Sequence, residues 1–377
     1  FNVCLNSMRY NIHSKKILKL LVRKKLKQSQ YILLLSAITQ IVYLNIKPYA
    51  VVNESVEVAK QIGLFPAFIN AVLKNISKKV SHFKKLSIKK EDLPEWFQKE
   101  IKDEKIAKLH EFLDSYFRTD NLHIVFKSNK FLRTFKEDYE ISSNKSVFLN
   151  SQKKVEELHG YEKGYWWVQN FSSMLPVSLN KNIKNKNVLD LCAAPGGKAF
   201  QILSEKGNIT VNDISKKRIK ILKQNLDRLS YSLEIKNLNA LNYPEKRLYD
   251  LILVDAPCSS VGTIRSNPEI FFREKSPDLK SLISLQHKLL VKSSKIIKPK
   301  GLIVYMVCSF LFSETIEQIN RFLHLNKNFK IQKYSNIQKD LKVESLISKD
   351  GYFHTLPTIY NKHLIDGFFS VQLKKDD

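Results

Sequence analysis

Cysteine is scarce in this sequence: 377 residues include only Cys4, Cys192, Cys258 and Cys308. None of the four forms a C-x-x-C pair, and none has histidines at metal-ligand spacing. A zinc site and a disulfide framework are therefore not expected, and we predict no bound metal. Free thiols are typical of a reducing compartment, so we expect a cytoplasmic protein.

Long hydrophobic runs are also missing. The longest, residues 31–46, is interrupted by polar side chains such as Ser36 and Gln40, and it is shorter than the roughly 20 apolar residues of a membrane helix. No signal-peptide pattern opens the chain. We therefore expect no membrane association. The chain does not begin with methionine, which suggests that residues precede it in the natural protein.

Acidic residues are rare in the first 90 positions. That stretch holds 17 lysines and arginines against only Glu54 and Glu57, a net charge of +15, and the whole chain carries +27. Such an excess favours a polyanionic partner, of which nucleic acid is the commonest. A proteome rich in lysine is the alternative explanation, and the uneven distribution argues partly against it.

The chain changes character twice. Residues 1–85 read as helices throughout, and the run 31–44, which is apolar nearly all round, predicts the core of a small bundle. Residues 86–160 predict a small α+β module that bridges two larger domains, with a helix at 103–117 and a short strand at 122–126. A third domain is predicted from residue 161 to residue 377.

From residue 187 onward the pattern alternates between strands and helices. Strands are predicted at 187–191, 208–212, 233–237, 249–254, 301–307 and 367–373, and helices at 198–205, 215–229, 279–297 and 313–325. Alternation of this kind indicates an α/β fold with a mostly parallel sheet and helices on both faces. Ligands of such sheets bind outside the carboxyl ends of the strands.

A glycine turn follows the first of these strands and precedes the first helix. It comprises Cys192, Ala193, Ala194, Pro195, Gly196, Gly197 and Lys198. Its glycines let the backbone approach a ligand, and the helix N-terminus presents unpaired N–H groups. The turn is not the G-x-G-x-x-G pattern, so NAD is not the expected ligand. Asp213, at the end of the next strand, is placed to accept hydrogen bonds from ribose hydroxyls, or alternatively to cap the helix that follows.

Two cysteines follow predicted strands of the same sheet. Cys258 comes three residues after Asp255, at the end of strand 249–254, and Cys308 ends strand 301–307. A packing role is the usual explanation of a buried cysteine, and we expect it for Cys4 and Cys192. Two thiols at strand ends beside a ligand suggest nucleophilic chemistry. The C5 carbon of a pyrimidine becomes nucleophilic once a thiolate adds to C6, and Asp255 is placed to stabilise the charge that develops near N3.

Four motifs give this pattern a specific resemblance. They are DLCAAPGGK (190–198), DAPCSSVG (255–262), RSNPE (265–269) and YMVCS (305–309). Together with DGFF (366–369) and the stretch 164–173, they resemble the RNA (cytosine-5) methyltransferases of the RsmB/Sun family. The helical N-terminus, through residues 46–59, resembles the NusB-like RNA-binding domain of the RsmB branch.

The resemblance implies a Rossmann-like class I methyltransferase domain with S-adenosylmethionine held by residues 192–198. It also implies Asp213 on the ribose, Asn239 near the adenine, Cys308 as the nucleophile and Cys258 as an aid to product release. Asn170 and Asn239 stand where the family usually has an acidic residue, and Val307 where threonine is common. We expect a monomer that methylates 16S rRNA. A tRNA substrate, or a non-catalytic RNA-binding or ribosome-assembly role, are the alternatives.

Overall fold

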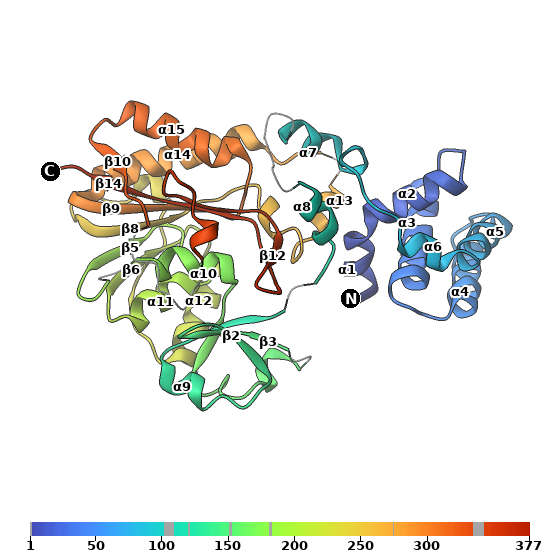
Figure 1. Ribbon diagram of the computed structural model, residues 1–377, viewed down its shortest axis with the longest axis horizontal. Coiled ribbons are helices and arrows are strands. Elements are labelled where there is room, and N and C mark those ends of the chain that lie inside the picture. The colour runs from blue at the N-terminus through green and yellow to red at the C-terminus, as the bar shows by residue number, and fades with distance from the viewer. Residues whose placement is uncertain are drawn as a thin grey trace. The chain divides into compact units, whose positions relative to one another are not determined.

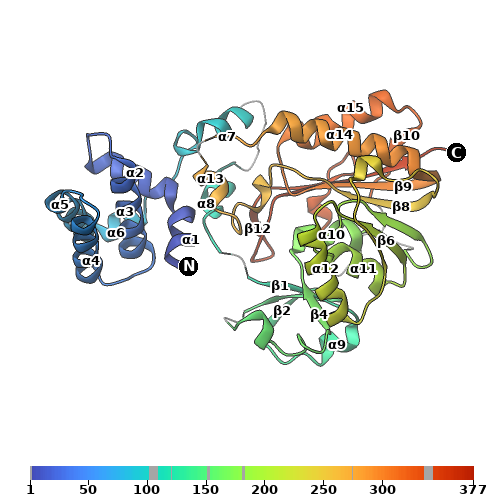
Figure 2. The ribbon, with the colours of Figure 1, turned by 180° about the vertical axis from the view of Figure 1, so that it is seen from behind.

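The protein is described here by a computed structural model, which covers residues 2–101, 109–119, 121–150, 153–180, 183–273, 275–334 and 343–377. The chain divides into two compact units (Figures 1 and 2). One comprises Phe1–Arg118 and Ile264–Ser276, and the other Thr119–Thr263 and Pro277–Asp377. The predicted three-domain division cuts the chain at other places and stays a prediction. Among the described helices, none is long and apolar enough to cross a membrane.

The first unit is built from helices, as predicted. Its elements are α1 (Asn2–Arg9), α2 (Asn11–Leu21), α3 (Gln28–Ile38), the π-helix η1 (Thr39–Tyr43), α4 (Pro48–Gln61), α5 (Pro66–Ser77), α6 (Val80–Lys84), the 3-10 helix η2 (Lys90–Asp92), α7 (Glu95–Glu100), α8 (Leu109–Ser115) and α13 (Glu269–Phe272). Helix α3 supplies much of the core through Leu34 and Ile38, which are fully buried. Pro48 and Pro66 each open a helix, where the missing N–H costs nothing. Part of the helix predicted at 103–117 lies outside the described residues.

Helix α13 comes from the middle of the chain but belongs to the first unit. Ile264, Ile270 and Phe271 are buried there. The Phe271 ring lies 4.8 Å from that of Phe97 and 5.6 Å from that of Tyr116, measured between centroids. The segment that follows the Cys258 loop is therefore part of the core of the N-terminal unit, which the sequence pattern did not predict.

A small antiparallel sheet opens the second unit. Its strands are β1 (His123–Phe126), β2 (Tyr139–Ser143), β3 (Ser146–Leu149) and β4 (Trp166–Val168), in the order β2-β3-β1-β4. Helix α9 (Asn129–Arg133) and the 3-10 helix η3 (Val155–Glu157) lie in its connections. The fully buried Trp166 ties the last strand to the module.

The main sheet of the second unit has the order β10-β14-β9-β8-β5-β6-β7, with β11 paired to β14. Its strands are β5 (Asn187–Asp190), β6 (Asn208–Asn212), β7 (Glu234–Lys236), β8 (Tyr249–Asp255), β9 (Ile297–Val307), β10 (Phe329–Ile331), β11 (Phe353–Thr355) and β14 (Phe368–Lys375). The five neighbouring strands β9, β8, β5, β6 and β7 are parallel to one another. Strand β14 is antiparallel to both β9 and β10. A separate hairpin joins β12 (Thr358–Tyr360) to β13 (His363–Ile365).

Helices cover both faces of this sheet, as expected for a doubly wound fold (Figure 1). They are α10 (Phe171–Ser178), α11 (Gly197–Ser204) and α12 (Lys216–Leu229) on one face, and α14 (Leu279–Ile296) and α15 (Ile316–Leu325) on the other. The short 3-10 helices η4 (Ala240–Asn242), η5 (Val261–Thr263), η6 (Phe312–Glu314) and η7 (Glu344–Leu346) lie in the connections. The strand order reverses between β5 and β8, where such sheets bind their ligands.

Candidate active site

The loop between β5 and α11 is held by the neighbouring strand β6. The Ala193 N–H donates to the Asn212 carbonyl (3.0 Å), and the Ala194 N–H donates to Asp213 Oδ2 (3.1 Å). Gly196 begins α11 with φ of +112°, where a Cβ would lie 2.4 Å from Phe200 and 2.5 Å from a methyl group of Leu222. Only glycine fits at this position, by conformation and by space.

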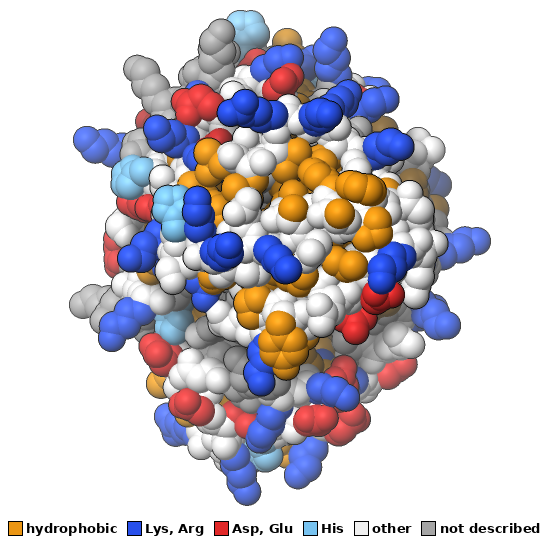
Figure 3. All heavy atoms as spheres, turned by 90° about the vertical axis from the view of Figure 1, so that its right-hand side faces the viewer, with side chains coloured by type: hydrophobic (Ala, Val, Ile, Leu, Met, Phe, Trp, Pro, Cys, Tyr) orange, Lys and Arg blue, Asp and Glu red, His pale blue; other side chains and the backbone are white. Residues whose placement is uncertain are grey.

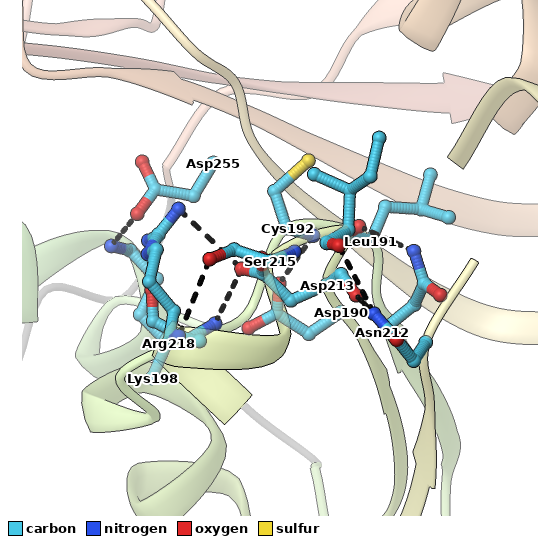
Figure 4. Close-up of polar contacts among 12 residues, drawn as sticks. Asp190, Leu191, Cys192, Lys198, Asn212, Asp213, Ser215, Arg218 and Asp255 are labelled. Carbon is cyan, nitrogen blue, oxygen red and sulfur yellow. Dashed lines mark hydrogen bonds and ion pairs between the residues drawn. The ribbon is translucent and has the colours of Figure 1, made fainter. Parts of the chain in front are cut away.

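Three carboxylates and two cations surround the loop (Figure 4). Lys198 Nζ lies 2.5 Å from Asp255 Oδ2 and donates to Ser173 Oγ (2.9 Å). Asp190 is buried beneath the loop, and its Oδ1 accepts the Cys192 N–H (3.3 Å). Burial raises the pKa of Asp190 to about 7, although the Lys198 charge partly opposes that rise. A ligand with a positive group would favour the ionised form of this acid.

Asp213 has both carboxylate oxygens engaged. Oδ1 accepts the Ser215 N–H (2.9 Å), and Oδ2, besides accepting from Ala194, lies 3.5 Å from Arg218 Nη1. Arg218 also donates to the Ala194 carbonyl. The side chain that caps α12 is that of Ser215, which accepts the Arg218 N–H. Asp213 therefore links the loop to the start of α12, and its role toward a ribose stays a prediction.

Asn212 is a site residue that the sequence pattern did not reveal. Its Nδ2 donates to the carbonyls of Leu191 and Leu238 (both 3.1 Å), and its Oδ1 accepts the Leu238 N–H (3.0 Å). This buried amide fastens the loop after β7 to the loop after β5. Asn239, the residue after Leu238, is exposed, and its Oδ1 accepts the Leu241 N–H (3.0 Å) at the start of η4. Its role beside an adenine also stays a prediction.

Asn170 stands in a position that is usually acidic in the RsmB/Sun pattern. Its Oδ1 accepts the Ser173 N–H (3.3 Å) and so caps α10, while its Nδ2 donates to Asp366 Oδ2 (2.9 Å). An aspartate here would face the buried Asp366 carboxylate without that donor. The amide therefore preserves the cap and satisfies one oxygen of Asp366.

The structure brings the two strand-end thiols into contact. Strands β8 and β9 are parallel neighbours with Asp255 paired to Met306, so Cys258 and Cys308 follow at the same edge of the sheet. Their Sγ atoms lie 3.3 Å apart. Ser260 Oγ lies 3.5 Å from Cys308 Sγ and 4.0 Å from Cys258 Sγ. Both cysteines are partly exposed.

The two thiols differ in acidity. The hydrogen bond that Cys308 shares with Cys258 lowers the pKa of Cys308 below that of an ordinary thiol, against the opposing effect of burial. The same hydrogen bond, followed by burial, raises the pKa of Cys258 well above the ordinary value. These directions favour ionisation of Cys308 over ionisation of Cys258. The thiolate is the nucleophilic form of cysteine, so they are consistent with the predicted role of Cys308, which stays a prediction.

Glu314 accepts hydrogen bonds from the loop that carries Cys258, a role that the sequence pattern did not predict. The side chain is fully buried. It accepts the Ser259 N–H (2.8 Å), the Ser259 hydroxyl (2.5 Å) and Gln286 Nε2 (3.0 Å). Gln286 Nε2 also donates to the Pro257 carbonyl (3.0 Å). An acid near the start of a helix reads in the sequence as an ordinary helix-dipole charge, so nothing marked this one.

These features fit S-adenosylmethionine. The first N–H groups of α11 have no carbonyl partner within the helix and can donate to a ligand. Asp190, Asp213 and Asp255 supply acceptors for hydroxyl and ammonium groups. When bound, the cofactor supplies an electrophilic methyl group.

Two family models match the chain. The 16S rRNA methyltransferase RsmB/F model matches residues 177–374, and the NusB family model matches residues 2–78. The ribosomal RNA small subunit methyltransferase B of Shewanella oneidensis is 30% identical to this chain over an alignment of 377 positions, gaps included. The alignment covers 93% of this chain and 84% of that protein.

Solved structures share the fold. The crystal structure of PH0851 superposes with a TM-score of 0.73 at 20% identity and covers 98% of this chain and 88% of its own. The crystal structure of NSun6 from Pyrococcus horikoshii with SFG gives a TM-score of 0.52 at 24% identity. That superposition covers 62% of this chain and 60% of the NSun6 chain. The family matches, with the paired thiols and the glycine loop, identify the chemistry. The chain belongs to the RsmB/F family of S-adenosylmethionine-dependent RNA (cytosine-5) methyltransferases and carries a NusB domain at its N-terminus.

Proposed function

We propose that this enzyme methylates C5 of a cytosine in 16S rRNA through a covalent bond between Cys308 Sγ and C6 of the base. The observation that carries the proposal is the contact between Cys258 and Cys308, in which the shared hydrogen bond favours the thiolate on Cys308. A base in this site has a nucleophile at one strand end and a proton-bearing thiol beside it.

The first step forms the S–C6 bond, and its electrons move into the ring toward N3. Asp255 holds the Lys198 ammonium at the next strand end, and this ammonium can stabilise the negative charge on the ring. C5 would then be nucleophilic enough to take the methyl group that bound S-adenosylmethionine would supply, and the sulfonium would leave as a neutral thioether.

The second step releases the product. Once Cys308 sulfur is bonded to carbon, its hydrogen bond and its charge no longer raise the pKa of Cys258, whereas burial and Glu314 still do. Cys258 can then lose its proton to water and take the proton from C5. The electrons of that C–H bond restore the C5–C6 double bond, and Cys308 leaves as the thiolate.

Substitution of the two thiols tests this assignment. Cys258→Ala should accumulate a covalent RNA–protein adduct that survives a denaturing gel, because the nucleophile is intact and release is blocked. Cys308→Ala should form no adduct. An adduct that needs Cys258 instead would reverse the two roles.

The choice of 16S rRNA draws on three observations. The matching family model is named for 16S rRNA methyltransferases, and the relative in Shewanella oneidensis is a small-subunit rRNA methyltransferase. The first unit is strongly basic, and Figure 3 shows lysine and arginine side chains around an apolar group on the face that carries α4 and α5. Exposed aromatic rings there, Tyr49 and Phe65, suit stacking on unpaired bases.

Bisulfite sequencing of 16S rRNA and tRNA from cells lacking the protein tests the substrate. We expect one cytosine of 16S rRNA to lose its methylation and so become convertible by bisulfite in these cells. The wild-type gene should restore its methylation, and the gene for Cys308→Ala should not. Loss of a tRNA site with intact 16S rRNA would assign the enzyme to tRNA, and no change in either RNA would favour an assembly role.

A further inference from the structure

Ser260 has an unusual backbone conformation for its residue type. Its φ is +62°, in the left-handed region that favours glycine. Residues held in such conformations cost stability and cluster at functional sites, because the surrounding structure must compensate for the strain. Ser260 lies in the loop that carries Cys258, two residues beyond it.

The loop holds the Ser260 side chain against the nucleophile. The Ser260 carbonyl accepts both the N–H and the hydroxyl of Thr263 (2.9 Å each). The Gly262 N–H donates to the carbonyl of Cys308 itself (3.1 Å). A Cβ on Gly262 would lie 1.9 Å from the Gly367 carbonyl oxygen, so the loop packs here on backbone alone. With the turn fixed at both ends, Ser260 Oγ lies 3.5 Å from Cys308 Sγ.

We propose that the Ser260 hydroxyl is a second hydrogen-bond donor to the Cys308 thiolate, beside the Cys258 thiol, and that it poises the nucleophile for attack. The inference rests on the proposed role of Cys308. A hydroxyl can reverse its hydrogen bond: it accepts the proton of the Cys308 thiol and donates to the thiolate. A donor to a charged sulfur is worth more than one to a neutral sulfur, so the contact favours ionisation.

The contact also bears on product release. Cys308 has no negative charge while it is bonded to C6, so the Ser260 hydroxyl stabilises the free thiolate and not the adduct. It therefore assists the departure of the sulfur as well as its ionisation. Since two donors serve the thiolate, removal of Cys258 leaves one in place, which is consistent with a Cys258→Ala protein that still attacks RNA.

The pH dependence of Cys308 alkylation tests the proposal in the full-length protein without RNA or cofactor. The probe is iodoacetamide, and the alkylation rate of each cysteine is followed by peptide mass spectrometry. The variant is Ser260→Gly, which removes the hydroxyl and relieves the backbone strain. Ser230→Gly is the matched control, because Ser230 also has a positive φ (+51°) but lies at the C-terminal end of α12.

Two opposing effects determine how the alkylation rate of Cys308 in Ser260→Gly should differ from that of the wild type as the pH changes. Without the hydroxyl the thiolate fraction falls, so Cys308 of Ser260→Gly should react at least about threefold more slowly at slightly acidic pH. The remaining thiolate is more basic and therefore more nucleophilic, so the rate should exceed that of the wild type at high pH. The two rate profiles should cross, whereas Ser230→Gly should follow the wild type.

A Cys308 profile that superposes on that of the wild type would overturn the proposal, and so would a uniform rise or fall at every pH, which indicates altered access alone. Ser260→Ala provides the second variant, since it removes the hydroxyl and keeps the Cβ; its profile must shift in the same direction. If RNA adducts instead form on Cys258, the assignment of the nucleophile fails while the alkylation result still reports whether Ser260 stabilises the Cys308 thiolate.

Discussion

Asp190 shows how burial sets the chemistry of a single side chain at this site. It is almost completely buried at the end of β5, two residues before the glycine turn at 192–198 begins. Its Oδ1 accepts the Cys192 N–H, and the acids Asp213 and Asp255 lie in the same cluster. An ionised carboxylate in this position carries a desolvation cost that the single cation Lys198 only partly offsets.

The Asp190→Asn variant should therefore be more stable than the wild type at pH 8. The folded-state pKa of about 7 lies above the unfolded value, so the stability that Asp190 contributes is present at pH 4 and is lost as the pH rises through 7. The gain for the amide should be about 2–4 kcal/mol at pH 8 and should vanish near pH 4. Urea unfolding at several pH values measures it. A gain that does not depend on pH would contradict the raised pKa.

Glu314 acts at the same scale, by placing the loop that carries Cys258. In Glu314→Gln the remaining oxygen can still accept the Ser259 N–H and Gln286 Nε2, and the new NH2 faces the Ser259 hydroxyl, so the three hydrogen bonds lose the carboxylate charge that strengthens them. We expect a loss of about 1–3 kcal/mol in stability. We also expect slower adduct release, since the loop behind Cys258 is no longer held.

Glu317→Gln is the control for this change, because Glu317 lies on the exposed side of α15. Thermal unfolding and gel analysis of the RNA adduct compare the two variants. Equal behaviour of Glu314→Gln and Glu317→Gln would show that the buried carboxylate does not position the loop.

At the scale of elements, the junction between β5 and α11 forms the loop that we predict to hold the cofactor. The helix can begin at Gly197 only because Gly196 turns with a positive φ in contact with Phe200 and Leu222. Asn212 of β6 then ties this loop to the loop after β7. The cofactor site is therefore a property of three strand ends together.

Gly196→Ala should weaken S-adenosylmethionine binding by at least about tenfold, because its Cβ collides with two core side chains and shifts the start of α11. Gly63→Ala is the control: Gly63 also has a positive φ (+67°), but a Cβ there meets nothing within 4 Å. That variant should lose about 1 kcal/mol of stability and no cofactor affinity. Calorimetry with the cofactor measures both. Unchanged affinity in Gly196→Ala would mean that the loop tolerates the shift.

At the scale of the whole molecule, the chain interleaves its two units. It leaves the second unit after Thr263, contributes Ile264–Ser276 to the first, and returns at Pro277 to begin α14. The insertion starts immediately after η5, in the loop that carries Cys258. Folding of the N-terminal unit therefore needs residues from the middle of the catalytic sequence.

Phe271→Ala should consequently destabilise the N-terminal unit, although residue 271 lies far along the chain. Removal of a buried ring that contacts Phe97, Phe112 and Tyr116 should cost about 3–5 kcal/mol. Hydrogen exchange of peptides from α7 and α8 should speed up, and that of peptides from β5 should not. Phe272→Ala, at a partly exposed neighbour, should have a smaller effect. Faster exchange in β5 alone would contradict the division into units.

The sequence by itself determined the elements whose signals are local. The strand–glycine–helix pattern at 187–205 and the alternation after it predicted the parallel sheet, and the apolar run near Leu34 predicted the core of the bundle. Apolar periodicity and glycine turns can be recognised in the sequence because they reflect the backbone geometry of short segments. The motifs around Cys258 and Cys308 likewise predicted two thiols at strand ends.

Only the tertiary structure decided which groups meet. Strand β14 inserts between β9 and β10, Glu314 reaches Ser259, and Ser260 reaches Cys308, each across about 40 to 70 positions of sequence. No local propensity encodes such pairs. Their formation depends on the packing of elements that are distant in the chain, and so does the acidity of a thiol, because burial and a neighbouring donor set it. The sequence thus identified the two thiols, and its family resemblance implied Cys308 as the nucleophile, whereas only the fold brought the two sulfur atoms into contact.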